Sequence, residues 1–331
     1  MFKRAADLGL DIGSKKTKLA KVKRKGLEWQ LVKYGCIDTP AGLVEAGNIS
    51  EPEKVGAGLA GLVKSMGLEG QRVVSAVSGQ QVYIRNLVLP RMSRVESREA
   101  AIYQAVTFLP IPIEEAAIDV FPLRDFEDED GKKSELFFVA VPRLQVDNLD
   151  LACHTAGLRL VAVEIEPLAI NRIMLPEYAS GVRALLQIGA SRCYFSVFSG
   201  HTLLFYRTLS SFYQNISFII GEENMDFESL KNIQEGQFRY IVRDLISEVN
   251  RSVEYFNIQH HPQKLERLWL CGGGTGLKGL DTALAAEISC EVQVADFLPR
   301  FILPADMDDR AKREINYDLP VALGLSAREV I

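Results

Sequence analysis

Two segments of this chain repeat one pattern: an apolar strand, a turn with glycine at its tip, and an alternating return strand. The first, residues 10–14, reads Leu-Asp-Ile-Gly-Ser, and the second, residues 186–190, reads Leu-Gln-Ile-Gly-Ala. Glycine lets the backbone turn tightly, so that successive amide groups can point at one anion. The repeat predicts two similar lobes that close on one polyphosphate. Nucleotide binding is therefore the leading hypothesis.

Side chains beside the two turns have the chemistry that a phosphate site needs. Asp11 is placed to hold a hydrated Mg²⁺ ion, which favours one or two carboxylates together with phosphate oxygens. Lys18, on the return strand, can reach the same phosphates as a point charge. The nucleotide-binding residues expected at the two turns are Gly13, Ser14, Lys15, Lys16, Lys18, Gly189 and Ala190.

A third glycine-rich turn follows a short apolar strand at residues 268–271. It begins with Gly272, Gly273 and Gly274 and leads towards a helix. A helix N-terminus at such a junction offers free amides and a favourable dipole to a ligand. Because three consecutive glycines cost backbone entropy, we favour a ligand role over the alternative, a connection that packs tightly on the sheet. The turn has neither the Walker A sequence nor clean Rossmann spacing.

The bulk composition is that of an ordinary soluble globular protein of 331 residues. Of these residues, 47% are hydrophobic and 24% charged, and a net charge of −5 leaves no global basic field for nucleic acid. Five scattered cysteines imply neither a zinc site nor a disulfide framework. There is no signal-peptide pattern and no run of about 20 apolar residues, so we expect a cytoplasmic protein without direct membrane insertion.

Strand and helix patterns predict an α/β protein. Residues 8–38 read as a strand meander, 51–66 as a helix and 73–77 as a buried strand. Further predicted elements are a helix at 96–108, strands at 117–124 and 135–142, a polar loop at 222–237, a long helix at 238–258 and a packed terminal helix at 319–326.

These elements divide the chain into four parts. The expected division is a first lobe at 1–85 and 161–182, an inserted subdomain at 86–160, a second lobe at 183–221 and 266–331, and a small subdomain of that lobe at 222–265.

The order of the three turns, with an insertion between the first and the second, resembles the actin-like ATPase superfamily. Within it, the chain resembles the PilM family of type IV pilus assembly proteins and, more distantly, the cell-division protein FtsA. The resemblance rests on residues 8–14, the proline-bounded segment 89–112, residues 114–119, 156–158, 164–168 and 272–280, and on Lys18 and Leu19. It covers nearly the whole chain.

This resemblance implies an actin-like ATPase fold of two lobes, each a mixed β-sheet with flanking helices, with ATP or ADP and Mg²⁺ in the central cleft. Glu248, Arg251 and Ser252 would contact the adenosine. The inserted subdomain and the first lobe would together form a groove for the N-terminal peptide of an inner-membrane PilN-like protein. Pilus motor ATPases and further copies of the chain are additional partners that the resemblance implies.

Two departures from the family pattern bear on catalysis. Gln187 stands where the second hairpin normally carries aspartate, and an amide cannot ligate or neutralise Mg²⁺ as a carboxylate can. Residues 210–215, Ser-Ser-Phe-Tyr-Gln-Asn, replace a usual Gly-Gly turn with bulky side chains. Both changes predict nucleotide binding with little or no turnover.

Three alternatives stay open. The first is a nucleotide-free scaffold of the same pilus or type II secretion machinery. The second is a true ATPase, for which Glu164 and Glu166 are the candidate catalytic carboxylates, although acids at a helix start are also favoured by the dipole alone. The third is an FtsA-like filament protein that binds membrane directly. It lacks support, because we find no C-terminal amphipathic helix.

Overall fold

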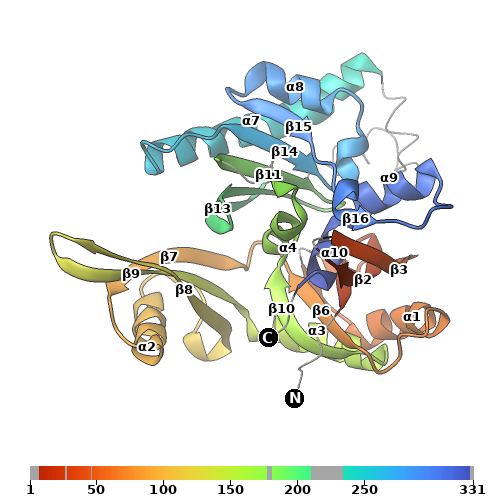
Figure 1. Ribbon diagram of the computed structural model, residues 1–331, viewed down its shortest axis with the longest axis horizontal. Helices are drawn as coiled ribbons and strands as arrows, with labels where there is room; N and C mark the ends of the chain where they lie inside the picture. The colour runs from red at the N-terminus through yellow and green to blue at the C-terminus, as the bar shows by residue number, and fades with distance from the viewer. Residues whose placement is uncertain (1–6, 27, 46, 177–180, 210–233, 329–331) are drawn as a thin grey trace.

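A computed structural model of the chain describes residues 7–26, 28–45, 47–176, 181–209 and 234–328 (Figure 1). Two β-sheets form the centres of two lobes, and a smaller three-stranded sheet projects from the first lobe. The predicted loop at 222–237 falls largely outside the described residues, as do residues 210–215.

The sheet of the first lobe has the strand order β10-β6-β1-β2-β3-β16. Strands β1, β2 and β3 form an antiparallel meander, and β6 and β10 extend the sheet in parallel from β1. The strands are β1 (Leu8–Ile12), β2 (Lys16–Lys25), β3 (Glu28–Asp38), β6 (Arg72–Val77), β10 (Arg159–Ile165) and β16 (Phe301–Ile302), with a small hairpin of β4 (Val44–Glu45) and β5 (Asn48–Ile49).

The sheet of the second lobe repeats this plan with the order β13-β12-β11-β14-β15. Its meander is antiparallel, and β14 and β15 add to β11 in parallel, as β6 and β10 add to β1. The strands are β11 (Val182–Ile188), β12 (Cys193–Ser199), β13 (Thr202–Leu209), β14 (Arg267–Cys271) and β15 (Glu291–Val294). The repeat seen in the two turns therefore extends to both sheets.

Helices cover the first sheet and join it to the second. They are α1 (Pro52–Ser65), α3 (Arg143–Thr155), α4 (Glu166–Ile173) and α10 (Pro320–Ser326). Helix α10 is buried along its whole length. It crosses β1 and α4 at close range, because a Cβ on Gly9 would lie 2.1 Å from the carbonyl oxygen of Ala322 and a Cβ on Gly324 would lie 2.0 Å from that of Ala169.

The projecting sheet has the order β7-β9-β8, with strands β7 (Tyr83–Pro90), β9 (Gly131–Pro142) and β8 (Ala116–Asp128). One face packs on α2 (Arg94–Ala105) through a small core around Leu136 and Phe138. Helix α2 begins two residues before the predicted start, because Ser93 and Glu96 form a capping box, and it ends three residues before the predicted end.

The second sheet is covered by α7 (Glu235–Gln259) and α8 (Leu280–Glu287) (Figure 1). Helix α7 begins three residues before the predicted start, where Gln234 and Gln237 form a capping box. Helix α9 (Asp309–Asp318) lies beside both lobes and leads into α10. Among the described residues, no helix is both long and apolar enough to span a bilayer.

Candidate functional site

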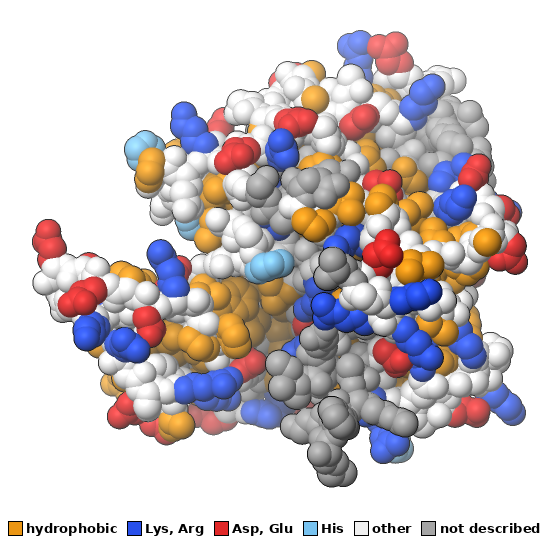
Figure 2. All heavy atoms as spheres, viewed as in Figure 1, with side chains coloured by type: hydrophobic (Ala, Val, Ile, Leu, Met, Phe, Trp, Pro, Cys, Tyr) orange, Lys and Arg blue, Asp and Glu red, His pale blue; other side chains and the backbone are white. Residues whose placement is uncertain are grey.

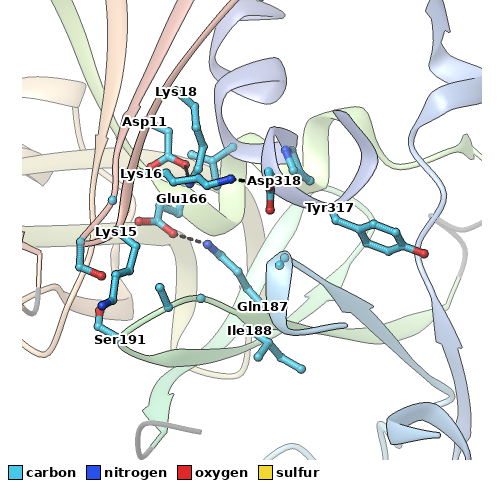
Figure 3. Close-up of a pocket in the computed structure, with 18 of the residues that line it drawn as sticks. Asp11, Lys15, Lys16, Lys18, Glu166, Gln187, Ile188, Ser191, Tyr317 and Asp318 are labelled. Atoms are coloured by element: carbon cyan, nitrogen blue, oxygen red, sulfur yellow. Dashed lines mark hydrogen bonds and ion pairs between the residues drawn. The ribbon is translucent and has the colours of Figure 1, made fainter. Parts of the chain in front are cut away.

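A cavity of about 860 Å³ lies where the two lobes meet (Figure 3). Its walls come from the β1–β2 turn, the β11–β12 turn, the start of α4, the turn after β14 and one face of α9. Of the predicted site residues, eleven line it: Asp11, Gly13, Ser14, Lys15, Lys16, Lys18, Glu166, Gly189, Ala190, Gly272 and Gly273. The volume is within the range of ordinary small-ligand sites.

The two turns have the same backbone geometry. The amide of Gly13 donates to the carbonyl of Lys16 at 3.1 Å, and the amide of Gly189 donates to that of Arg192 at 2.9 Å. A Cβ on Gly13 would lie 2.9 Å from its bonded carbonyl oxygen, and a Cβ on Gly189 would lie 3.0 Å from its own. The hairpin itself therefore favours glycine at both positions, whatever binds there.

The strand residues next to the first turn form an ion pair. Asp11 and Lys18 face each other across β1 and β2, and the ammonium of Lys18 lies 2.8 Å from the carboxylate of Asp11. The two side chains are only 10% and 17% exposed. Burial by itself lowers the pKa of Lys18. Attraction to Asp11, and then to Asp318 and Glu166, outweighs burial and raises that pKa above its usual value. Lys18 is therefore a fixed positive charge in the cavity.

At the second turn, the equivalent pair is neutral. Gln187 and Tyr194 face each other across β11 and β12, as Asp11 and Lys18 do in the first hairpin. The amide nitrogen of Gln187 donates to the carboxylate of Glu166, which joins the second lobe to the first (Figure 3). The Gln187 oxygen is buried and has no hydrogen-bond partner among the described residues.

Glu166 is the first residue of α4 and directly follows β10. Burial, and then repulsion by Asp11, raise its pKa to about 7, while hydrogen bonds from Ser78 and Gln187 act in the opposite direction. A carboxyl group with this pKa can accept or release a proton near neutral pH. Glu164, two residues earlier, forms ion pairs with Arg172 at 2.6 Å and with Arg328 at 3.1 Å.

The glycines of the third turn have a packing role. The sequence had favoured a ligand role for them over tight packing on the sheet. Gly272 has a φ of +92°, and a Cβ there would lie 2.6 Å from the carbonyl oxygen of Ile188 on β11. The close approach of the two backbones thus explains why position 272 needs glycine. Gly272 and Gly273 also line the cavity. Gly274 is buried and does not line it.

The three residues predicted on α7 do not line the cavity. Ser252 is fully buried, and its hydroxyl donates to the carbonyl of Glu248 at 2.8 Å. The guanidinium of Arg251 donates to the carbonyl of Ser247 on the same helix. The structure therefore does not bring this set together with the two turns.

Sequence analysis missed the contribution of α9. Arg310, Arg313, Glu314 and Tyr317 line the cavity, and their spacing of three, four and seven residues places them on one helical face. Asp318, at the end of the helix, lies 3.5 Å from Lys16 of the first turn. That spacing was readable from the sequence, but nothing local indicated that the face meets a cavity.

Similarity to known proteins extends over nearly the whole chain. Residues 9–330 match the family model described as type IV pilus assembly protein PilM. The chain belongs to the PilM family. It is similar to the structure described as a PilM-PilN type IV pilus biogenesis complex, with a TM-score of 0.84, 26% identity and 98% of each chain covered.

A more distant likeness shows the fold alone. The ethanolamine utilization protein EutJ from Carboxydothermus hydrogenoformans matches with a TM-score of 0.52 and 15% identity, over 96% of this chain and 88% of that one. These matches and the two repeated sheets identify the actin-like ATPase fold, so the expectations on family and fold are both confirmed.

Proposed function

We propose that this protein is a nucleotide-binding adaptor of type IV pilus assembly that holds ATP or ADP in the cavity between its lobes. One observation carries the proposal: two turns that are closed by equivalent glycine hydrogen bonds, one from each lobe, face the same cavity. Each turn offers backbone amides, and the first adds the fixed charge of Lys18. Lys15 and Arg192 bring further positive charge from the two turns.

The residues present also fit a magnesium ion. Asp11 is a buried carboxylate next to the first turn, and hydrated Mg²⁺ takes one or two carboxylates together with phosphate oxygens. When bound, the ion would neutralise part of the phosphate charge. Gln187 supplies an amide where a second charged ligand is usual, so we expect little or no hydrolysis.

A thermal-shift measurement tests the nucleotide part. A ligand that binds only the folded chain stabilises it by about 2.7 kcal/mol at a concentration of about 100 times its dissociation constant. ATP should therefore raise the melting temperature, and AMP, which cannot bridge both turns, should raise it much less. Equal shifts from the two nucleotides would contradict the polyphosphate assignment.

We also propose that the N-terminal peptide of a PilN-like inner-membrane protein docks beside the projecting sheet. The face opposite α2 is apolar and open, with Val88 52% exposed and Phe121 58% exposed. The same face turns towards the second lobe, because Asn86 donates to the carbonyl of Leu203 at 3.3 Å. Figure 2 shows a hollow lined by hydrophobic side chains between this sheet and the second lobe.

Fluorescence anisotropy with a labelled PilN N-terminal peptide tests this site. Phe121→Asp should weaken peptide binding by at least about tenfold, because a charge would replace a central apolar contact. Tyr103→Asp is the matched control, since Tyr103 lies on α2, on the other face of the subdomain, and is 83% exposed. Equal losses in both variants, or none in Phe121→Asp, would contradict the site.

An ATPase is the second candidate function, and Glu166 favours it. A carboxyl group with a pKa of about 7 inside the cavity is suited to act as a general base. Steady phosphate release that disappears in Glu166→Gln would establish this function in place of the adaptor without turnover.

Partner docking at the inner membrane would place the protein in the cytoplasm, held at the membrane by its partner. Pilus motor ATPases and further copies of the chain stay predicted partners.

A further inference from the structure

One turn of the first lobe lies between the cavity and the projecting sheet. Ser78 and Gly79 follow the end of β6, and β7 begins four residues later at Tyr83. Ser78 itself lines the cavity. A short piece of backbone therefore separates the proposed nucleotide site from a strand of the proposed peptide site.

Two tyrosines of the second lobe hold this turn. The side chain of Ser78 interacts with those of Glu166 and Tyr194, and the side chain of Tyr206 interacts with the backbone of Gly79. The rings of Tyr194 and Tyr206 stack with centroids 5.9 Å apart and an interplanar angle of 13°. They come from the neighbouring strands β12 and β13, so the pair binds the turn as one unit.

Two further side chains fix the carbonyls of the turn. The hydroxyl of Thr208, on β13, lies 3.5 Å from the carbonyl oxygen of Gly79. From the first lobe, the Gln145 amide donates to the Ser78 carbonyl at 2.9 Å and to that of Gly47 at 2.7 Å. The turn thus has partners in both lobes, and a shift of one lobe against the other must change them.

These contacts are costly to break. Burial raises the pKa of both tyrosines, which therefore stay neutral and act as hydrogen-bonding groups. Separating a buried hydroxyl from its partner costs free energy, because water cannot replace the lost contact. The tyrosines and the turn are therefore expected to move together rather than to separate.

We propose that Tyr194, Tyr206 and the Ser78–Gly79 turn couple occupancy of the nucleotide cavity to the conformation of β7. This inference rests on the proposed nucleotide function. Tyr194 lies directly opposite Gln187, next to the second turn, so a polyphosphate that draws the two turns together also moves Tyr194. The stacked rings pass that movement to Gly79 and to β7, which carries Asn86 and Val88 of the peptide face.

Hydrogen–deuterium exchange of the full chain, with and without saturating ATP and magnesium, tests the coupling. Exchange at the two turns reports nucleotide binding, and exchange in β7 reports the coupled strand. In the wild type, we expect ATP to slow exchange in both places, by about fivefold in β7. Tyr206 does not line the cavity, so Tyr206→Phe should keep the protection of the turns and lose that of β7.

Thr208→Val gives a second variant that removes a hydroxyl at nearly constant volume, and it should act in the same direction. The matched control is Tyr255→Phe, which removes a half-exposed hydroxyl from α7 and should respond as the wild type does. Protected turns with an unchanged β7 in the wild type would overturn the coupling alone. So would a full β7 response in both Tyr206→Phe and Thr208→Val. Turns that ATP does not protect would overturn the nucleotide proposal, and the coupling with it.

Discussion

The two hairpins that face the cavity share a backbone and differ in charge. Both close with a glycine amide that donates to a carbonyl three residues later, at 3.1 Å in the first and 2.9 Å in the second. The residue pair beneath the turn is Asp11 with Lys18 in the first lobe and Gln187 with Tyr194 in the second. The backbone hydrogen bond is therefore the repeated feature, and a charged residue pair beneath the turn occurs only in the first hairpin.

This difference assigns separate roles to the lobes. The first hairpin offers a buried carboxylate and a fixed ammonium, which suit a metal ion and phosphate oxygens. The neutral pair of the second hairpin makes contacts between lobes instead, with Gln187 reaching Glu166 and Tyr194 reaching Ser78. We infer that the first hairpin mainly binds the ligand. The second hairpin mainly makes the contacts that hold the two lobes together.

Breaking the charged pair should have the largest effect. Asp11→Asn leaves the buried ammonium of Lys18 without its carboxylate, and the loss of one partner of a buried ion pair costs about 3 kcal/mol. In the second hairpin, Gln187→Ala removes a hydrogen bond and a buried but uncharged side chain, and it should cost less, about 1 kcal/mol. Urea denaturation measures both free energies of unfolding. Equal costs would remove the distinction between the two copies.

The pH dependence of stability tests the contact between lobes. Because the pKa of Glu166 rises from 4.5 to about 7 on folding, the folded chain holds a proton that the unfolded chain releases. Stability should therefore fall as the pH rises from about 4.5 to about 7 and stay lower above that range. Glu166→Gln should flatten this slope and be more stable than the wild type at pH 8 by about 2 kcal/mol. A wild-type slope that persists in the variant would contradict the assignment.

The shared backbone predicts equal effects from equal substitutions. Gly13→Ala and Gly189→Ala each force a methyl group to within about 3 Å of a carbonyl oxygen of the same turn, and each should cost about 1–2 kcal/mol. Gly58→Ala on α1 is the control, because a Cβ there meets no atom within 4 Å. A large difference between the two turns in denaturation experiments would show that their geometries are not equivalent.

Making the second hairpin more like the first should have a smaller effect. Gln187→Asp places a third acid near Asp11 and Glu166, so it should destabilise the chain without metal. Millimolar MgCl₂ should then restore about 1 kcal/mol, which for a chain of 331 residues is a rise of about 1–2 °C in melting temperature. The wild type should respond less to MgCl₂ alone. If MgCl₂ stabilised both proteins equally, Gln187 would not be the cause of weak metal binding.

The sequence was most informative where local rules decide the structure. A glycine tip between alternating strands predicted both hairpins, and both were found, because a Cβ on Gly13 or on Gly189 would collide with its own turn. Helices α2 and α7 begin earlier than predicted, because each starts at a capping box that the pattern of apolar residues did not reveal. The family resemblance supplied the fold, which the repeated sheets then confirmed.

Sequence analysis failed where distant segments meet. No local pattern indicates that Gln187 bonds to Glu166, that Gly272 passes against Ile188, or that α9 faces the cavity. Each of these contacts depends on how the two lobes pack, which is a property of the whole fold. The same reason explains why Glu164 and Glu166, only two residues apart, have such different surroundings.

Isothermal titration of the pure protein with ATP and magnesium tests the central claim most directly, with Asp11→Ala as the comparison. We predict that the wild type binds one ATP without phosphate release and that Asp11→Ala weakens binding by at least about tenfold, or about 1.4 kcal/mol. Wild-type protein that binds no ATP under these conditions would contradict the account. It would mean that the neutral second hairpin has left a nucleotide-free scaffold.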